Sequence, residues 1–454
     1  MNSFEEKGFW WIPNDKENRV AGVLKFDPEK GIKLELFDSL NVQNSRLTRF
    51  GERIPYEDVI LGLTSKNVTL YQCYQINSAF DVGVIFHNHH FENVEDIEFD
   101  RINITYPNLD TWVGKSGLVL IEKELEMGLK DQLFGYKPPN EIYAKIKNIE
   151  IQISFQFLPL PNPPSEIRLM QRIFIELKTD IKTHFDLFND KILHLLYQFL
   201  TLAIGRAVYP LSINGYNNSF KYKVLGKEIN PEINIFHERK RFRHMGKIRK
   251  QEMLFSFSDI SDNFEKYLNN WFEKAEDLEW VYNLYTATIL AKSMLIEHKF
   301  LSLAQALESY HQRVYKGKYL TKGKYRKIKR ELLLNIPKNI PNDLEQNLRD
   351  RIIYGNAYSF NSRLTEIYEN YSEILDLVID DKETFVEDVI NTRNFFTHFS
   401  NSLEKKAKSD DELVNLTDQI RCILEVCLLA ELGMSLNKIK DIIMRNKRYK
   451  YFKN

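Results

Sequence analysis

The chain has 454 residues, of which 43% are hydrophobic and 13% aromatic. Its length allows two or three domains with separate cores, and its composition excludes an intrinsically disordered protein. Lys and Arg together number 63, as do Asp and Glu. This balance excludes a uniformly basic nucleic-acid-binding protein, so any attraction to a polyanion must come from local clusters of charge.

The cysteines and the apolar segments indicate the compartment. Only Cys73, Cys422 and Cys427 occur, and they suggest neither a disulfide framework nor a zinc site. The N-terminus lacks a signal-peptide pattern. The longest apolar stretch, Ile192 to Ile204, is shorter than the ~20 residues that span a bilayer. We therefore expect a cytoplasmic protein with no membrane partner.

The first third of the chain has the pattern of β-structure. Val20–Phe26 and Ile32–Leu36 are expected to form two strands joined by a turn, because apolar and polar residues alternate in the second segment. The clearest strand is Ile149–Phe157, and Ile173–Leu177 is a further expected strand. Short strands separated by turn residues predict a sandwich or a barrel.

The hydrophobic period changes near residue 186. Leu187–Ile204 is expected to be a mostly buried helix, and the mixed stretch that follows to about residue 250 gives no clear pattern. From Ser258 onward the chain is expected to be almost entirely helical. Apolar residues recur at three- and four-residue spacing in Leu413–Leu428, Gly433 has the position of a C-cap, and Ser435 that of the N-cap of a last helix.

These patterns predict an α+β multidomain protein. We expect a β-rich N-terminal domain, sandwich- or barrel-like, over residues 1–180. A mixed connecting region with a buried helix would follow over residues 181–255, and an all-α helical bundle would occupy residues 256–454. No internal repeat was found.

The segment 391–400, NTRNFFTHFS, combines three chemically capable side chains with three phenylalanines. On a helix from about Glu383 to Phe399, Asn394 and His398 are four residues apart and share a face. Arg393 lies about 100° round the helix from Asn394. The aromatic side chains are expected to pack on the opposite, core-facing side: Phe385, Phe396 and Phe399.

The polar face of this helix suits RNA cleavage. An imidazole exchanges protons near neutral pH, and a guanidinium can hold a phosphate and stabilise charge that builds up in a transition state. Together they fit a reaction in which a 2′-hydroxyl attacks the adjacent phosphate without a metal. The alternative is that Arg393 and His398 are structural residues at a solvated edge of the core.

The motif from Arg393 to His398 resembles the R-x4-6-H signature of the HEPN ribonucleases, including the polar residue that commonly follows the Arg. Its surroundings are also similar, because a polar loop (Asn401 to Asp411) and a long apolar helix follow it. Upstream, Phe300–His311 resembles the F-L-S-L-x-Q-A-L-E-x-x-H helix of ApeA-type HEPN proteins.

The N-terminal part resembles the same family. Gly8–Pro13, Val20–Gly22 and Leu34–Leu40 are similar to the start of the β-rich domain of ApeA-type anti-phage defence proteins. The resemblance covers most of the chain, and residues 205 to 290 carry least of it.

The resemblance implies a metal-independent, cofactor-free endoribonuclease of an abortive-infection system that cuts tRNA or mRNA. Its active site would form where two HEPN domains meet in a homodimer or larger homo-oligomer, and a phage-derived trigger would release it through the β-rich domain. His398 would activate the 2′-hydroxyl or protonate the leaving 5′-oxygen, and Arg393 would neutralise the pentacovalent phosphate. Asn394 would orient the His or the substrate. Glu308 is a supporting residue that would hold Arg393 or His398.

Basic clusters add independent support for RNA binding, although such runs are also common on solvated helix faces. The run after the Glu308 helix is the first choice for RNA contact, because interleaved tyrosines can stack on unpaired bases. Its candidate RNA-binding residues are Lys316, Lys318, Lys322, Lys324 and Arg326. Two further basic runs lie at residues 239–250 and 438–453.

Two other features suggest ligands less directly. The tract His87-Asn88-His89-His90 has the composition of a metal site, but no acidic or cysteine partner has ligand spacing, so we predict no metal. Trp10 and Trp11 would serve as a sugar-stacking platform or, as we prefer, as packing residues. The alternative functions are therefore a non-catalytic HEPN-fold module that binds RNA or protein, and a ligand-binding β-rich domain with a helical dimeriser.

Overall fold

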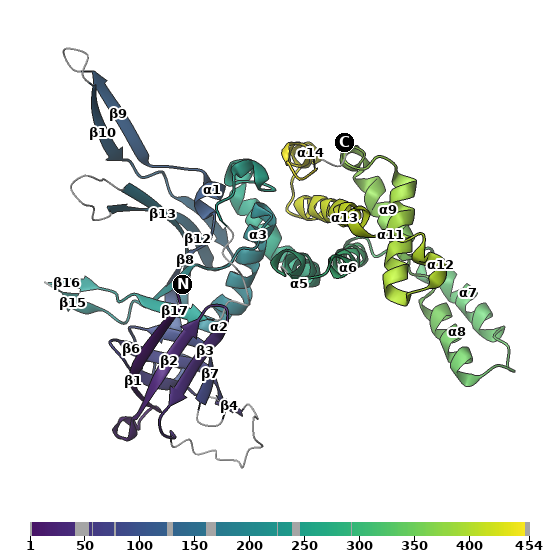
Figure 1. Ribbon diagram of the computed structural model, residues 1–454. Coiled ribbons are helices and arrows are strands. Elements are labelled where there is room, and N and C mark those ends of the chain that lie inside the picture. The colour runs from purple at the N-terminus through teal and green to yellow at the C-terminus, as the bar shows by residue number, and fades with distance from the viewer. Residues whose placement is uncertain are drawn as a thin grey trace. The chain divides into compact units, whose positions relative to one another are not determined.

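The computed structural model describes residues 2–40, 54–56, 58–76, 79–124, 130–159, 169–224, 226–237, 246–291 and 293–449. The chain forms two compact units, Met1–Asn269 and Asn270–Asn454. The first unit is rich in β-strands and the second is helical (Figure 1), so the predicted fold class is confirmed. Part of the basic run at 239–250 (residues 239–245) and the last residues of the run at 438–453 (450–453) lie outside the described residues.

A barrel forms the N-terminal part of the first unit. Its strands follow the order β7-β3-β2-β1-β5-β6, and antiparallel pairing of β6 with β7 closes the ring. The expected hairpin is confirmed as β2 and β3, which meet at the Asp27–Gly31 pair. The strands are β1 (Phe4–Trp11), β2 (Val20–Asp27), β3 (Gly31–Leu36), β5 (Ile60–Leu63), β6 (Asn67–Ile76) and β7 (Ala79–His87), with β4 (Ile54–Tyr56) beside β6.

The barrel core explains the tryptophan pair. Trp10 is completely buried and Trp11 is 3% exposed, so their interpretation as packing residues is confirmed. A Cβ atom on Gly62 would lie 2.2 Å from the Trp10 ring, which means that this close approach of strand β5 requires glycine. The Trp10 indole therefore fills the barrel and offers no sugar-stacking surface.

An open sheet continues from the second half of β7, which pairs with β17 beyond the end of β3. The order is β7-β17-β14-β8-β13-β12-β11, all antiparallel. Strand β12 confirms the predicted strand Ile149–Phe157. The strands are β8 (Glu98–Thr105), β11 (Ile142–Ile146), β12 (Ile149–Pro159), β13 (Leu169–His184), β14 (Ser212–Tyr216) and β17 (Ile233–His237), with separate hairpins β9 (Leu118–Glu124)–β10 (Lys130–Tyr136) and β15 (Tyr222–Val224)–β16 (Lys227–Ile229).

Short helices cover one face of the open sheet (Figure 1). Trp112 of α1 (Leu109–Val113) contacts Phe199 of α3 (His194–Ile204) and Phe257 of α4 (Phe257–Ile260). The expected helix from Leu187 is present as α2 (Phe185–Leu187), a π-helical turn (Phe188–Leu193) and α3. Because β14 and β17 follow α3 in the chain and lie inside the sheet, residues 181–255 belong to the first unit in space.

The second unit is a helical bundle, into which α5 (Phe264–Leu290) continues from the first unit. Helix α13 (Asp410–Glu431) has most of its apolar residues buried, as its spacing predicts. Ser435 accepts the backbone N–H of Lys438 and caps α14 as predicted, and Gly433 has φ 88°. The remaining helices are α6 (Ile296–Val314), α7 (Lys322–Leu334), α8 (Asn342–Tyr354), α9 (Phe360–Asn370), α10 (Ser372–Leu375), α11 (Lys382–His398), α12 (Asn401–Glu404) and α14 (Leu436–Arg445).

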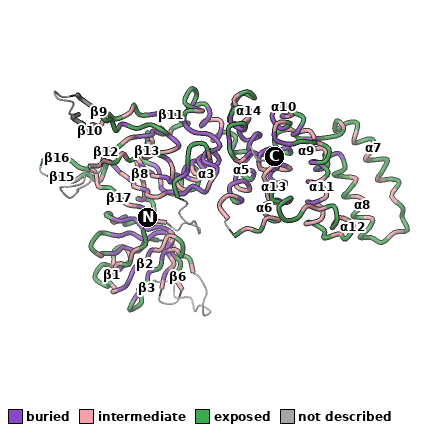
Figure 2. The backbone as a smooth tube through the Cα atoms, turned by 45° about the horizontal axis from the view of Figure 1, so that its top comes forward, coloured by how far each residue is buried: buried purple, intermediate pink, exposed green. Residues whose placement is uncertain are grey.

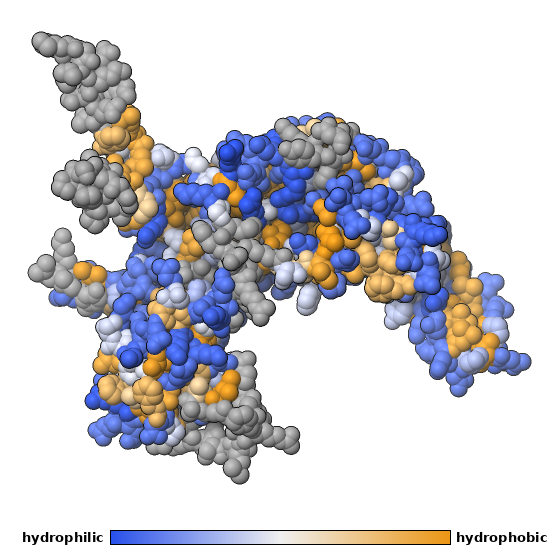
Figure 3. Space-filling view, viewed as in Figure 1, coloured by the Kyte–Doolittle hydropathy of each residue, from blue (hydrophilic) through white to orange (hydrophobic). Residues whose placement is uncertain are grey.

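Helices α7 and α8 form a hairpin in which no residue is buried (Figure 2). Large apolar or aromatic side chains are nevertheless present on its surface, and Figure 3 shows an orange area on this hairpin. Those that are at least 41% exposed are Ile328, Leu332, Leu334, Leu344, Ile353 and Tyr354. No helix in the described part of the chain combines the length and the apolar character needed to cross a membrane.

Candidate functional site

Helix α11 carries the Arg393–His398 motif. Asp381 caps its N-terminus by accepting the backbone N–H of Thr384 at 2.8 Å. The helix ends at His398, and Phe399 adopts a left-handed conformation with φ 49°. Its ring is 71% exposed, so the expectation that Phe399 packs on the core face is wrong. The reason is that the helical period stops one residue earlier and no longer determines where Phe399 points.

Arg393 is held by three neighbours from three helices. Its Nη1 donates to Asn394 Oδ1 at 3.3 Å, and its Nη2 lies 3.6 Å from Glu308 Oε2 on α6. The guanidinium carbon lies 5.9 Å from the centre of the Phe360 ring, the first residue of α9. The predicted supporting residue Glu308 thus lies beside Arg393.

These contacts orient Arg393 without neutralising it permanently. The Arg393 and Glu308 side chains are each 31% exposed, and ion pairs with this degree of exposure contribute only about 0–1 kcal/mol. A guanidinium has five N–H donors, so donors remain beyond the two contacts. An incoming phosphate would therefore compete easily with Glu308 for the same fork.

His398 is exposed at the last position of α11. Within the described residues its imidazole has no hydrogen-bond or ion-pair partner. Asn394, which we expect to orient the imidazole or the substrate, accepts a hydrogen bond from Arg393. Arg393 and His398 therefore both lie at the C-terminal end of α11. Arg393 is restrained by neighbouring side chains, whereas His398 is not restrained in this way by the described residues.

Sequence reasoning missed two residues of this site. Phe360 comes from a helix that no local signal connects to Arg393. Thr392 is buried, and its Oγ1 accepts the backbone N–H of Lys408 at 3.0 Å. This bond holds the segment that follows His398 against α11, so it restrains the helix end that carries the imidazole.

A buried network behind the site joins the two helices that contact Arg393. His311 on α6 is fully buried and lies 2.6 Å from Glu366 and 3.2 Å from Arg363, both on α9. Burial of the imidazole lowers the pKa of His311 although Glu366 opposes the shift. Since Glu308 and His311 lie on one turn of α6, the network fixes Glu308 relative to Phe360.

The predicted RNA-binding residues are all exposed. Lys316 and Lys318 lie on the loop after α6, where Gly317 accepts the backbone N–H of Tyr358 at 3.1 Å and Lys318 bridges to Ala357. This loop therefore contacts the segment that leads into α9, and the first residue of α9, Phe360, lies beside Arg393.

The other three candidates lie on α7. Lys322 and Arg326 are four residues apart and share a face, whereas Lys324 lies about 200° round the helix from Lys322. The structure thus separates Lys324 from the pair on the same helix.

The histidine tract lies in three different environments. His87 is buried against Phe4 and Phe236, and His89 stacks on Phe220 at 3.9 Å. His90 contacts the carbonyl oxygen of Gly62 at 2.8 Å. Among the residues that the structure describes, no three His, Cys, Asp or Glu side chains converge in a way that would hold a metal ion.

Two family models match the chain. The model of the Apea-like HEPN domain matches residues 301–438, a range that includes Glu308, Arg393 and His398. The helical unit therefore contains an HEPN domain, a class whose members are generally nuclease-like.

The model of ApeA N-terminal domain 1 matches residues 5–271, more than half of the chain. The chain belongs to the ApeA family of HEPN-containing proteins, which act in anti-phage defence. No curated protein and no solved structure gives a significant match.

Proposed function

We propose that this protein is a metal-independent endoribonuclease whose active site consists of Arg393, Asn394 and His398. The observation that carries the proposal is the end of α11. There an exposed imidazole, which has no partner among the residues that the structure describes, follows an oriented but weakly paired guanidinium. A purely structural pair would be expected to use both groups within the protein.

The reaction would proceed by transfer within the RNA backbone. His398 accepts the proton of a 2′-hydroxyl, whose oxygen forms a bond to the adjacent phosphorus. Arg393 leaves Glu308 and neutralises the charge of the pentacovalent phosphate. The bond from phosphorus to the 5′-oxygen then breaks, and this oxygen takes a proton from an imidazolium. The products are a 2′,3′-cyclic phosphate and a 5′-hydroxyl end.

The exposed basic residues would hold the RNA, which we expect to be tRNA or mRNA. The loop with Lys316 and Lys318 connects through Tyr358 to the Arg393 site, so an RNA strand bound there would lead toward the motif. Lys322, Lys324 and Arg326 would contact further phosphates. Neutralising any one of these five residues should weaken RNA binding and reduce its salt dependence by about one counterion.

A second copy of the chain would complete the site. The apolar side chains exposed on the α7–α8 hairpin are of the kind that subunit interfaces bury. Leu332→Asp should therefore shift the protein toward the monomer in analytical ultracentrifugation, while Lys327→Asp on the same helix, which is also exposed, should have a smaller effect. We further propose that the β-rich unit responds to a phage-derived trigger, and that the protein acts in the cytoplasm, where its three free, buried cysteines would stay reduced.

The deciding experiment compares the full-length protein with its His398→Ala and Arg393→Ala variants on total cellular RNA in the presence of EDTA, with the cut ends mapped. Loss of an acid–base group should reduce cleavage by about 10²–10⁴-fold, and loss of Arg393 by about 10²–10³-fold. Glu308→Gln should retain most of the activity, because Glu308 only orients Arg393.

The matched control is His298→Ala, an exposed histidine on α6, which should cut as the wild type does. If all variants cut equally, the site is wrong. If the wild type binds RNA but cuts none, even with extract from infected cells, the HEPN unit is a non-catalytic binding module.

A further inference from the structure

The open sheet of the first unit has one apolar and one polar face. In β8, the buried residues Ile102 and Ile104 alternate with Arg101, Asn103 and Thr105. Strands β12, β13 and β14 alternate in the same way, and their buried residues include Ile153, Ile175 and Ile213. The helices cover the apolar face, so the polar side chains of these strands gather on the other face.

Strand register arranges these polar side chains in rows. Glu176, Asn103, Asn214 and Asn234 occupy successive strands in one row. On β13, Phe174 lies two residues before Glu176, and Arg172 lies two residues before Phe174. Arg172 pairs with Gln156 on the neighbouring strand β12.

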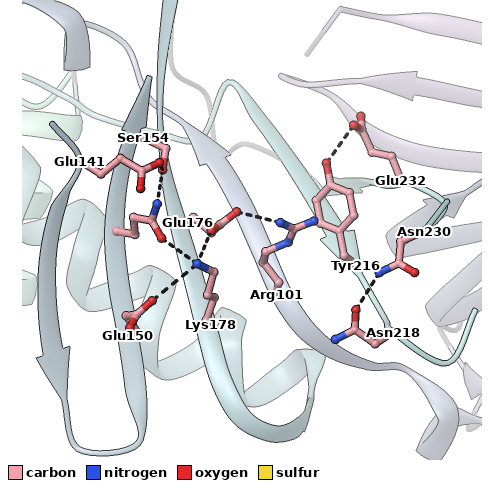
Figure 4. A network of polar contacts seen from close by, with 11 residues as sticks. Arg101, Glu141, Glu150, Ser154, Glu176, Lys178, Tyr216, Asn218, Asn230 and Glu232 are labelled. Atoms are coloured by element: carbon pink, nitrogen blue, oxygen red, sulfur yellow. Dashed lines mark hydrogen bonds and ion pairs between the residues drawn. The ribbon is translucent and has the colours of Figure 1, made fainter. Parts of the chain in front are cut away.

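One half of the polar face is internally paired (Figure 4). Arg101 donates to Glu176 at 3.2 Å, and Lys178 lies 2.8 Å from the same carboxylate and 3.6 Å from Glu150. The Arg101 guanidinium also lies 4.2 Å from the centre of the Tyr216 ring. These charges are compensated by one another, so this half has no electrostatic need for a ligand.

The other half contains a cavity of about 210 Å³. Some groups of its lining bond to one another, Thr105 to Ser212 at 2.6 Å and the Tyr216 hydroxyl to Glu232 at 3.0 Å, whereas others have no such partner. Asn103 Oδ1 is buried and accepts no hydrogen bond from the described residues. Gln156 and Arg172 also line the cavity, and neither has a side-chain partner within the described part of the chain. Phe174 provides a half-buried aromatic ring two residues further along β13 from Arg172.

We propose that this cavity binds one nucleotide. The base would stack on Phe174, since every base has a π-face that an aromatic ring can receive. The amides of Asn103 and Gln156 would bond to the donor and acceptor edge of the base. Arg172 would bind the phosphate, because it has no carboxylate partner among the described residues, and the one carboxylate that the cavity lining shows, Glu232, accepts a hydrogen bond from Tyr216.

Spacing and size agree with this assignment. Arg172 and Phe174 are two residues apart on the same face, a rise of roughly 6.6 Å along the strand, which is a suitable offset between a stacked base and its phosphate. The cavity is smaller than the ~300–1,000 Å³ of drug-sized sites, so it has room for no more than one nucleotide. A neutral sugar would leave Arg172 without a counter-charge. The proposal is independent of the ribonuclease function of the helical unit.

The test is isothermal titration calorimetry of the full-length His398→Ala protein with the four nucleoside 5′-monophosphates. This variant is used because the proposed nuclease reaction would then add no heat to the binding signal. A short single-stranded DNA oligonucleotide forms a second arm, which distinguishes a free nucleotide from a nucleotide at a chain end. It lacks the 2′-hydroxyl, so the proposed nuclease reaction cannot cut it. At least one of these probes should bind. Arg172→Gln should weaken its binding by about tenfold or more, and Phe174→Leu by about fivefold or more.

Lys33→Gln, which removes an exposed cation from β3 of the same unit, is the matched control and should bind as the parent does. Gln156→Ala, at an exposed position, is a second site variant that should fold even if Phe174→Leu does not. Absence of binding by every probe overturns the proposal. So does binding that Arg172→Gln and Gln156→Ala leave unchanged, or tighter binding of N-acetylglucosamine than of any nucleotide.

Discussion

Glu425 on α13 is a fully buried carboxylate at the centre of a polar cluster in the helical unit. It accepts hydrogen bonds from the Tyr285 hydroxyl at 2.6 Å and from Arg421 Nε at 2.7 Å, and a further bond from the Tyr449 hydroxyl. Arg448 Nη1 lies 3.5 Å away. Glu425→Gln would keep the size of the side chain and remove the charge that two guanidiniums share.

The magnitude follows from how little water reaches these groups. The Arg421 side chain is 15% exposed and that of Arg448 is 23% exposed. Removing one partner of a buried ion pair costs about 3–5 kcal/mol, because the other charge stays behind without compensation. For a unit of this size, that loss corresponds to a decrease in Tm of roughly 6–20 °C.

The effect should also depend on pH. Burial acts to raise the pKa of Glu425, but the charges of Arg421 and Arg448 and the tyrosine hydrogen bonds outweigh it and leave the pKa lowered. A lowered carboxyl pKa stabilises the fold above the ordinary value of 4.5, and this contribution is lost as pH falls through the folded-state pKa. The difference between wild type and variant should therefore shrink in acid.

Differential scanning calorimetry of the full-length protein measures the transition of the helical unit. Glu412→Gln on the same helix is the control, because Glu412 is 70% exposed and lies 3.8 Å from Lys408. It should cost no more than about 1 kcal/mol. If Glu425→Gln costs no more than Glu412→Gln, the two guanidiniums are solvated and the reasoning is refuted.

Two predictions concern the first unit. Gly62→Ala would place a methyl group 2.2 Å from the Trp10 ring and should lower the free energy of unfolding of the barrel by about 1–3 kcal/mol. Urea unfolding followed by tryptophan fluorescence measures this loss, and an unchanged midpoint would contradict the packing. Burial lowers the pKa of His89 to about 4, with a smaller contribution from His90. The unfolded chain then binds more protons between about pH 4 and 6.5, so stability rises with pH in that window. His89→Asn should flatten this rise, and an NMR titration midpoint of His89 near 6.5 would be inconsistent with the burial.

Local patterns predicted much of this architecture. The alternation in Ile149–Phe157, the turn before Gly31 and the cap at Ser435 are all present in the structure. Such features depend on residues that are close together in the sequence, so the local pattern of side chains is enough to predict them. The motif Arg393–His398 was likewise recognisable because its residues lie on a single helix.

Contacts between distant segments required the tertiary structure. Phe360 beside Arg393, and the insertion of β14 and β17 into the open sheet, depend on how the chain returns on itself. The exposure of Phe399 depended on where α11 stops, which a helical period cannot determine. The sequence by itself thus determined several of the elements, most of the faces that were predicted for them, and the motif. Only the tertiary structure decided which faces meet, because side chains far apart in the chain become neighbours only when the core excludes water from between them.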